Sequence, residues 1–199
     1  MDKRIKSIEF IEDTHEYWFV DSEGHRRQLK GITSAIGKFL EKDFPDTDTV
    51  KIATVYGSAV HKAVENYLNS GNKNLSSEGE KWVIAELEKL SMDTVGVDAM
   101  DCCEGEVMVS DFETTASKVD IVLHSKEGAY LFDIKTTSHF DRFYCSLQLS
   151  IYKKLYEENY GEEVKGMFVL STKQKRKFRI IEQSKELVDK ILSYNRTLS

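Results

Sequence analysis

Two carboxylates and a lysine on neighbouring predicted strands carry the strongest chemical signal in the sequence. Asp133 and Lys135 follow the apolar run 129–132, and residues i and i+2 of a strand point to one face, so their side chains project together. Asp120 lies in the apolar run 118–123, and a tight turn between the two runs places it at the same end of a hairpin as Asp133. Two adjacent carboxylates disfavour each other's ionised forms unless a cation neutralises them. The pattern indicates a divalent-metal site, although Asp133 and Lys135 taken alone also fit a salt bridge at a strand end.

Hard divalent ions suit such a pair of carboxylates. Mg²⁺ binds oxygen ligands and usually takes only one or two carboxylates, with water and phosphate completing its shell. A nearby Lys135 would orient or deprotonate an attacking water, or stabilise negative charge in the transition state of phosphoryl chemistry.

Polar residues on two predicted helices extend this group. His61 and Glu65 are one helical turn apart and share a face, as do Gln148 and Tyr152. A lone helical histidine is usually a packed or surface residue, and Glu65 fits a solvated helix charge best. Glu106 precedes the Asp120 strand. It is either an additional carboxylate of the site or an ordinary glutamate at a strand edge, and the sequence favours neither.

A basic run stands out against an acidic background. The chain carries 28 Lys and Arg against 34 Asp and Glu, a net charge of −6, which argues against coating nucleic acid through bulk charge. The run holds five cations in seven residues, namely Lys173, Lys175, Arg176, Lys177 and Arg179. It predicts a local phosphate-binding patch, with Lys175, Lys177 and Arg179 on one face of a strand, or else a solvated hairpin.

The hydrophobic patterns predict a mixed α/β (α+β) fold, with a central mixed β-sheet flanked by helices. Strand-like runs rich in β-branched and aromatic residues cover 7–12, 16–21, a third segment after the turn at 21–24, 106–109, 118–123, 129–134, 164–171 and 177–182. Helical patterns cover 33–40, 50–68, 78–91, 142–159 and 184–194, and a loop is expected at 43–49. A capping box at Ser77 and Glu80 and a stop at Gly161 bound two of these helices. The strand order does not follow from these patterns.

Size and cysteine usage indicate one intracellular domain. The 199 residues are enough for one substantial core, so a single domain over 1–199 is expected, with a β-hairpin and helix in 1–50, a core at about 51–182 and a C-terminal helix at about 184–195. No apolar run is long enough for a membrane span, and the N-terminus does not resemble a secretory signal. Three cysteines, two of them adjacent, provide no disulfide framework, so a cytoplasmic location is expected.

Four motifs in order resemble one known family. Asp120, followed thirteen residues later by Asp133-Ile134-Lys135, resembles the signature of the PD-(D/E)XK nucleases, and in particular their RecB-like and phage-exonuclease branch. The segment 57–61 resembles the GxxxH helix of that branch, and 148–152 resembles its QxxxY helix. Glu16-Tyr17 and the segment 31–34 are similar to the N-terminal region of small phage-encoded members. The resemblance covers about residues 15–172.

The resemblance implies a restriction-endonuclease-like core and a Mg²⁺- or Mn²⁺-dependent deoxyribonuclease. The residues that match the motifs would bind metal at His61, Asp120, Asp133 and the Ile134 carbonyl. Lys135 would position or activate water, and Gln148 with Tyr152 would support the lysine or the substrate phosphate.

The same resemblance implies a role as a DNA-end exonuclease in phage-type recombination or repair. DNA is the expected partner, with a single-strand-annealing or recombination protein as a further candidate. A DNA-binding or regulatory protein on this fold and an endonuclease remain alternatives.

Two departures from the family pattern matter. Ser117 stands three residues before Asp120, where the family usually has glycine, and serine fits there unless the backbone needs a positive φ or DNA approaches very closely. Some relatives bind an iron–sulfur cluster through four cysteines. Three cysteines cannot supply those ligands, so no cluster is expected.

Overall fold

The computed structural model describes residues 1–41 and 48–197, and the side chains from residue 54 onward in the second range. The loop expected at 43–49 therefore lies largely outside the described residues. Its last two positions are helical, because α2 begins at Asp48, two residues earlier than the sequence pattern predicts.

In residues 1–41 and 48–197, eight strands and six α-helices form a mixed α/β fold, which confirms the predicted fold class. The strands are β1 (Ile8–Ile11), β2 (Glu16–Val20), β3 (Arg26–Gly31), β4 (Cys103–Ser110), β5 (Thr115–Ser125), β6 (Gly128–Lys135), β7 (Val164–Ser171) and β8 (Arg176–Arg179). The helices are the 3-10 helix η1 (Lys3–Ser7), α1 (Ile32–Phe39), α2 (Asp48–Ser70), α3 (Glu78–Thr94), α4 (Ala99–Cys102), α5 (Arg142–Tyr160) and α6 (Lys185–Thr197). The short helices η1 and α4 were not predicted, because fewer than two helical turns produce no readable periodicity.

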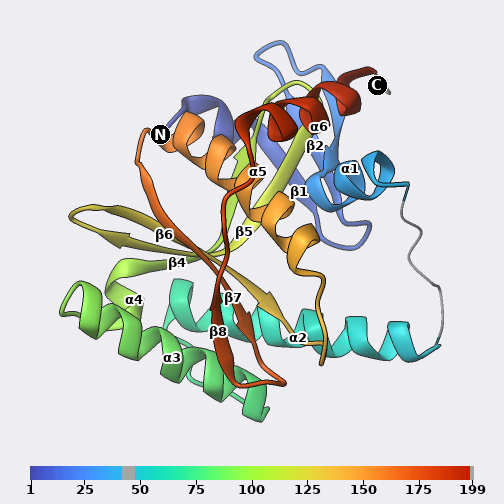
Figure 1. Cartoon of the computed structure of the whole chain (residues 1–199). Coiled ribbons are helices and arrows are strands. Elements are labelled where there is room, and N and C mark those ends of the chain that lie inside the picture. Colours follow the sequence, from blue (N-terminus) through green and yellow to red (C-terminus); the bar gives the residue numbers. More distant parts are fainter. Residues whose placement is uncertain (42–47, 198–199) are drawn as a thin grey trace.

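The strands form one mixed sheet with the path β1-β2-β3-β5-β6-β7-β8, and β4 pairs with β5 off this path (Figure 1). The pairs β3–β5 and β6–β7 are parallel, and the remaining pairs are antiparallel. The long strand β5 has β4 along one edge, whereas its other edge pairs with β6 near one end and with β3 near the other. The centre of β5 therefore lies where β3 and β6 diverge.

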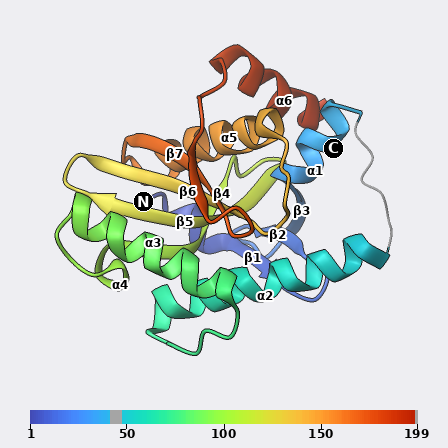
Figure 2. The ribbon, with the colours of Figure 1, turned by 60° about the horizontal axis from the view of Figure 1, so that its bottom comes forward.

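Helices cover both faces of the sheet (Figures 1 and 2). Helices α1, α5 and α6 contribute to one apolar cluster, whose buried members include Ile36, Leu147 and Ile191. Helices α2, α3 and α4 contribute to a second cluster on the other face, with Val60 and Leu87 fully buried. In the described part of the chain, no helix is long and apolar enough to cross a membrane.

Two helix ends follow the local chemistry that the sequence predicts. Ser77 accepts a hydrogen bond from Glu80 N while the Glu80 carboxylate accepts from Ser77 N, so the capping box of α3 is complete. Helix α5 ends at Gly161 with φ +69°, a left-handed conformation that glycine adopts without strain. The capping box starts α3 at the predicted residue, and Gly161 directs the chain into β7.

The outer edge of β4 is closed by side chains instead of a further strand. The Asn69 amide accepts a hydrogen bond from Gly105 N and donates one to Gly105 O. Asn159 does the same for Ser110, and Tyr160 OH donates to the carbonyl of Met108. Asparagine side chains from α2 and α5 thus occupy backbone positions that a neighbouring strand would otherwise take.

Candidate active site

The divergence of β3 and β6 creates the place where Asp120 sits. The β5–β6 ladder ends at the pair Ile121 and Phe132, so Asp120 and Asp133 are the next residues along the two strands. Asp120 Oδ2 then accepts a hydrogen bond of 2.6 Å from Ile134 N. The carboxylate takes over the role of the missing ladder partner, and this contact fixes its orientation.

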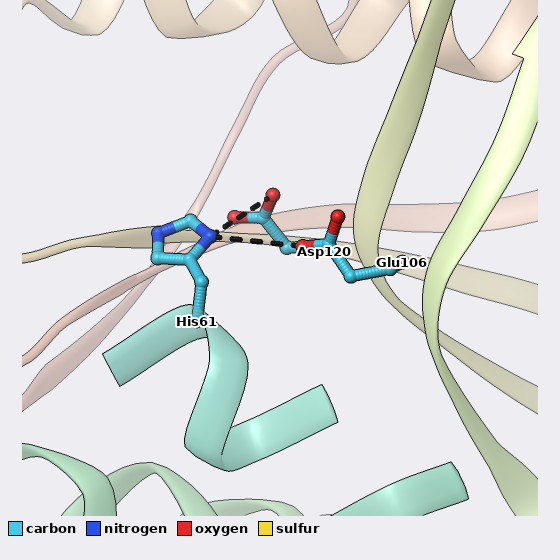
Figure 3. A group of neighbouring side chains, drawn as sticks. All are labelled: His61, Glu106 and Asp120. Atoms are coloured by element: carbon cyan, nitrogen blue, oxygen red, sulfur yellow. Dashed lines mark ion pairs between the residues drawn. The ribbon is translucent and has the colours of Figure 1, made fainter. Parts of the chain in front are cut away.

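His61, Glu106 and Asp120 converge from α2, β4 and β5 (Figure 3). The imidazole Nδ1 lies 3.5 Å from Asp120 Oδ1 and 3.9 Å from Glu106 Oε1. One ligand atom from each residue lies within 4.8 Å of the other two. All three side chains keep some solvent access, so an ion could reach them.

The other nitrogen of His61 is held by the backbone. His61 Nε2 lies 3.2 Å from the Ile134 carbonyl oxygen, so the neutral ring that donates from Nε2 presents the Nδ1 lone pair to the two carboxylates. Metal-binding histidines commonly donate their second ring N–H to a carbonyl in this way, which fixes the tautomer. The resemblance implies the Ile134 carbonyl as a metal ligand. In the structure this carbonyl lies at Nε2 of His61, whereas the carboxylates of Asp120 and Glu106 face Nδ1.

Glu106 reaches this group through an unusual backbone conformation. It lies opposite Asp120 in the β4–β5 register, between the pairs Gly105–Ile121 and Val107–Val119, yet the two residues form no ladder pair. Its φ is +58°, which costs an L-residue roughly 1–2 kcal/mol. Such strain concentrates at functional sites, and here it directs a carboxylate toward His61. The sequence left this residue undecided, since no local pattern signals a positive φ at a glutamate.

Asp133 and Lys135 form a nearly buried ion pair beside this group. The Asp133 side chain is 2% exposed, and its Oδ1 accepts a hydrogen bond of 3.0 Å from Lys135 Nζ. Asp133 Oδ2 lies 2.9 Å from the same nitrogen but accepts no hydrogen bond within the described residues. Asp133 is thus adjacent to Asp120 in the strand register but lies outside the three-residue cluster.

A chain of hydrogen bonds connects Lys135 to the helix α5. Lys135 Nζ donates to Gln148 Oε1 at 3.3 Å, and Gln148 Nε2 donates to Tyr152 OH at 3.0 Å. The Tyr152 hydroxyl lies 3.2 Å from Ser117 Oγ, so Ser117 closes the chain of hydrogen bonds. The structure therefore brings Gln148 and Tyr152 to Lys135, and it adds Ser117, whose contact no sequence pattern signals.

The charges of the site shift one another's titration. Burial lowers the pKa of His61, but the carboxylates of Asp120 and Glu106 outweigh it and leave that pKa well above the usual value. Burial raises the pKa of Asp120, but His61 and Lys135 outweigh it, so its net shift is downward. Burial and the neighbouring Asp120 raise the pKa of Asp133. The pKa of Lys135 is also raised, because the attraction of Asp133 exceeds the effect of burial, so Lys135 is an ammonium at neutral pH.

The donor set fits a divalent cation. One imidazole nitrogen and two carboxylates provide mixed nitrogen and oxygen ligands, which suit Mn²⁺ and related ions, while the carboxylate share suits Mg²⁺. Without a cation, the two acidic side chains rely on His61 and on Lys118, whose Nζ is 3.7 Å from Glu106 Oε2, for compensation. His61, Glu106 and Asp120 are the residues that would hold the ion, and Asp133 is the nearest further carboxylate along the strands.

The other residues that the sequence singled out lie outside the cluster of His61, Glu106 and Asp120. Glu65 pairs with Lys62 at 2.9 Å and does not belong to the cluster. Lys175 Nζ lies 4.0 Å from Glu78, and Lys177 Nζ lies 3.7 Å from Glu86, both on α3.

The other cations of the basic run are arranged differently. Lys173 Nζ lies 4.8 Å from the centre of the Tyr56 ring, and the Arg176 guanidinium lies 5.1 Å from the Phe178 ring. By register, Lys177 and Arg179 lie on one face of β8 and Arg176 on the other, so the basic run does not form a single surface.

Comparisons with known proteins find a likeness to solved structures. The chain matches no family model, and no curated protein matches its sequence. A solved structure from Eubacterium rectale, described as a "Putative exonuclease", superimposes with a TM-score of 0.41 and 13% sequence identity. The alignment covers 81% of this chain and 68% of that one.

Proposed function

We propose that this protein is a metal-dependent nuclease that hydrolyses phosphodiester bonds of DNA. The observation that supports it best is the convergence of His61 Nδ1, Glu106 and Asp120 within 4.8 Å of one another, beside the buried pair of Asp133 and Lys135. Carboxylates and a histidine bind the divalent ions that phosphoryl chemistry uses. An ordinary structural salt bridge needs neither the strained Glu106 nor the histidine.

Each residue then has a distinct task. His61, Glu106 and Asp120 would hold the cation, and Asp133 would complete the acidic side of the site. A bound divalent cation supplies Lewis-acid polarisation of a phosphate oxygen and lowers the pKa of a bound water. Lys135 carries a positive charge, so it donates to the attacking water or to a phosphate oxygen and does not accept a proton.

In the hydrolysis, a water oxygen forms a bond to phosphorus, and the bond from phosphorus to one deoxyribose oxygen breaks. The water loses a proton, and the leaving oxygen takes one up. Gln148 and Tyr152 are positioning residues in this scheme, because their hydrogen bonds hold Lys135 Nζ from the side of α5. We further propose, on the motif resemblance, that cleavage starts from DNA ends in recombination or repair.

A cleavage assay with end-labelled linear duplex, linear single strand and closed circular DNA tests this proposal. We expect degradation of linear DNA with Mg²⁺ or Mn²⁺ and none with EDTA. Asp120→Asn serves as the matched inactive variant. Cutting of circular DNA would identify an endonuclease instead, and metal-independent binding without cleavage by the wild type would refute the enzymatic proposal.

A further inference from the structure

Two arginines from separate elements stack on one aromatic ring next to the candidate active site. The Arg142 guanidinium lies 4.9 Å from the centre of the Phe178 ring, and that of Arg176 lies 5.1 Å from it. Arg142 begins α5 and Arg176 begins β8, and both side chains are exposed, whereas Phe178 is buried. Both positive groups therefore contact the same ring.

Neither guanidinium forms an ion pair with any described carboxylate. Arg4, Arg26 and Arg196, in contrast, each lie within 2.9 Å of an acidic oxygen. The nearby Asp141 carboxylate caps α5 by accepting from Tyr144 N. Two like charges at one ring, with no counter-charge among the described residues of a chain of net charge −6, leave the planar donor forks of both groups available for an anion.

The strand register ties this pair to the catalytic face of the sheet. Lys135 pairs with Ser171 of β7, and Ser171 pairs with Arg176 of β8, so the three side chains lie on one face. Two strand spacings separate Lys135 from Arg176, or about 10 Å between their backbones. Gln174 Nε2 also donates to Ser138 O, which joins the β7–β8 hairpin to the segment that leads into α5 (Figure 2).

The lysines of the same hairpin are arranged for a different purpose. Lys175 and Lys177 approach Glu78 and Glu86 of α3, so their charge is already compensated on the opposite face. Arg176 is the member of the basic run that shares the face of Lys135.

From these observations we propose that Arg142 and Arg176 form a clamp for a backbone phosphate of the DNA strand, close to the bond that is cut. Arginine forks match the geometry of phosphate oxygens, and the shared Phe178 ring holds both side chains ready before the anion arrives. The location of the cut bond rests on the proposed function, whereas phosphate binding by the two arginines does not.

Binding of a short labelled duplex in Ca²⁺, measured by fluorescence anisotropy across a salt series, tests the clamp. Arg142→Gln/Arg176→Gln should weaken binding on the order of a hundredfold, or about tenfold for each charge-assisted hydrogen bond removed. The slope of log affinity against log salt should flatten by about 0.9 for each phosphate that the variant no longer neutralises. Arg142→Lys/Arg176→Lys should keep most of the slope and lose part of the affinity. Arg26→Gln/Lys165→Gln removes two cations that are already paired with Glu9 and Glu163, and it should leave both values unchanged.

A scan with single neutral methylphosphonate linkages locates the clamp. Wild-type protein should lose affinity at one or two adjacent positions beside the cleavage site, and the glutamine double variant should lose this positional effect. A folded double variant with an unchanged salt slope, or with the positional effect intact, would overturn the clamp even if the wild type cleaves DNA. If the wild type shows the positional effect but does not cleave, the clamp stands and the nuclease proposal fails. No DNA binding by the wild type would overturn both.

Discussion

Replacing Glu106 by glycine should make the metal-free protein more stable and the metal-bound protein less stable. Glycine adopts the observed φ of +58° without steric cost, which removes strain of roughly 1–2 kcal/mol. Part of that gain is lost because glycine has more conformational freedom to lose on folding, by roughly 0.5–1 kcal/mol. The lost attraction to His61 at 3.9 Å and to Lys118 at 3.7 Å is offset by the lost repulsion from Asp120. The net gain in the free energy of unfolding is then about 1 kcal/mol, or about 2–4 °C in Tm for a chain of this size.

With a cation present the order should reverse. A ligand at a hundred times its Kd stabilises the protein that binds it by about 2.7 kcal/mol, and the variant lacks one of the three side chains that we propose as metal ligands. Thermal unfolding of both proteins in EDTA and in Mn²⁺ should therefore give curves whose order changes between the two conditions. Cleavage by the variant should be lost in parallel.

A matched substitution isolates the backbone effect. Glu41 follows the end of α1 with φ +50° and is exposed, so Glu41→Gly relieves a similar strain far from the metal ligands in sequence. It should raise Tm in EDTA and leave the Mn²⁺ response unchanged. The strain assigned to Glu106 is refuted if its glycine variant is less stable than the wild type in EDTA, and its role as a ligand is refuted if that variant keeps the full Mn²⁺ response.

Three further predictions concern other residues of the candidate active site. The pKa of His61 is raised above the usual value of about 6.5, so its ion pairs stabilise the metal-free fold fully below pH 6.5 and lose this effect as pH rises through the folded pKa. The difference in Tm between wild type and His61→Gln in EDTA should therefore shrink as pH rises through that range. A difference that stays constant with pH would contradict the role of these ion pairs. Lys135→Ala should abolish cleavage and cost up to about 3 kcal/mol, because it leaves Asp133 buried without its partner; more than a tenth of wild-type activity would exclude the assigned role. Tyr152→Phe should cost about 1–3 kcal/mol by leaving the buried Gln148 amide with one bond fewer, and it should lower kcat more than it raises KM; an unchanged kcat would leave Tyr152 a purely structural residue.

The sequence predicted the hairpin that carries Asp120 and Asp133 because a tight turn between two apolar runs sets the strand register. Helical spacing likewise placed Gln148 and Tyr152 one turn apart, and the structure joins them by a hydrogen bond. The predicted strands and long helices are present, and their ends differ from the predicted ends by a few residues at most. These features depend on contacts that are local in the chain.

Features that depend on distant contacts could not be predicted. The strained φ of Glu106 reflects the pairing of β4 with β5 and the position of α2, and no residue type signals it. The shared face of Lys135 and Arg176 depends on β7 lying between β6 and β8, which is a matter of strand order. The sequence predicted that Lys177 and Arg179 lie on the opposite face of the strand from Phe178. It did not predict that Lys177 approaches Glu86 of α3.

The edge of β4 that Asn69 and Asn159 cover is a site where the chain could aggregate during folding. Asn159 contacts Ser110 across 49 positions of sequence, so this part of the edge stays open until α5 has docked. An open edge of a strand pairs readily with strands of other molecules and leads to aggregation. Asn159→Leu should therefore increase aggregation during refolding in proportion to protein concentration, whereas Asn69, on the helix α2 that packs directly on β4, protects the other half of the edge independently. The edge of β4 is thus most open to self-association during folding, before α5 has docked.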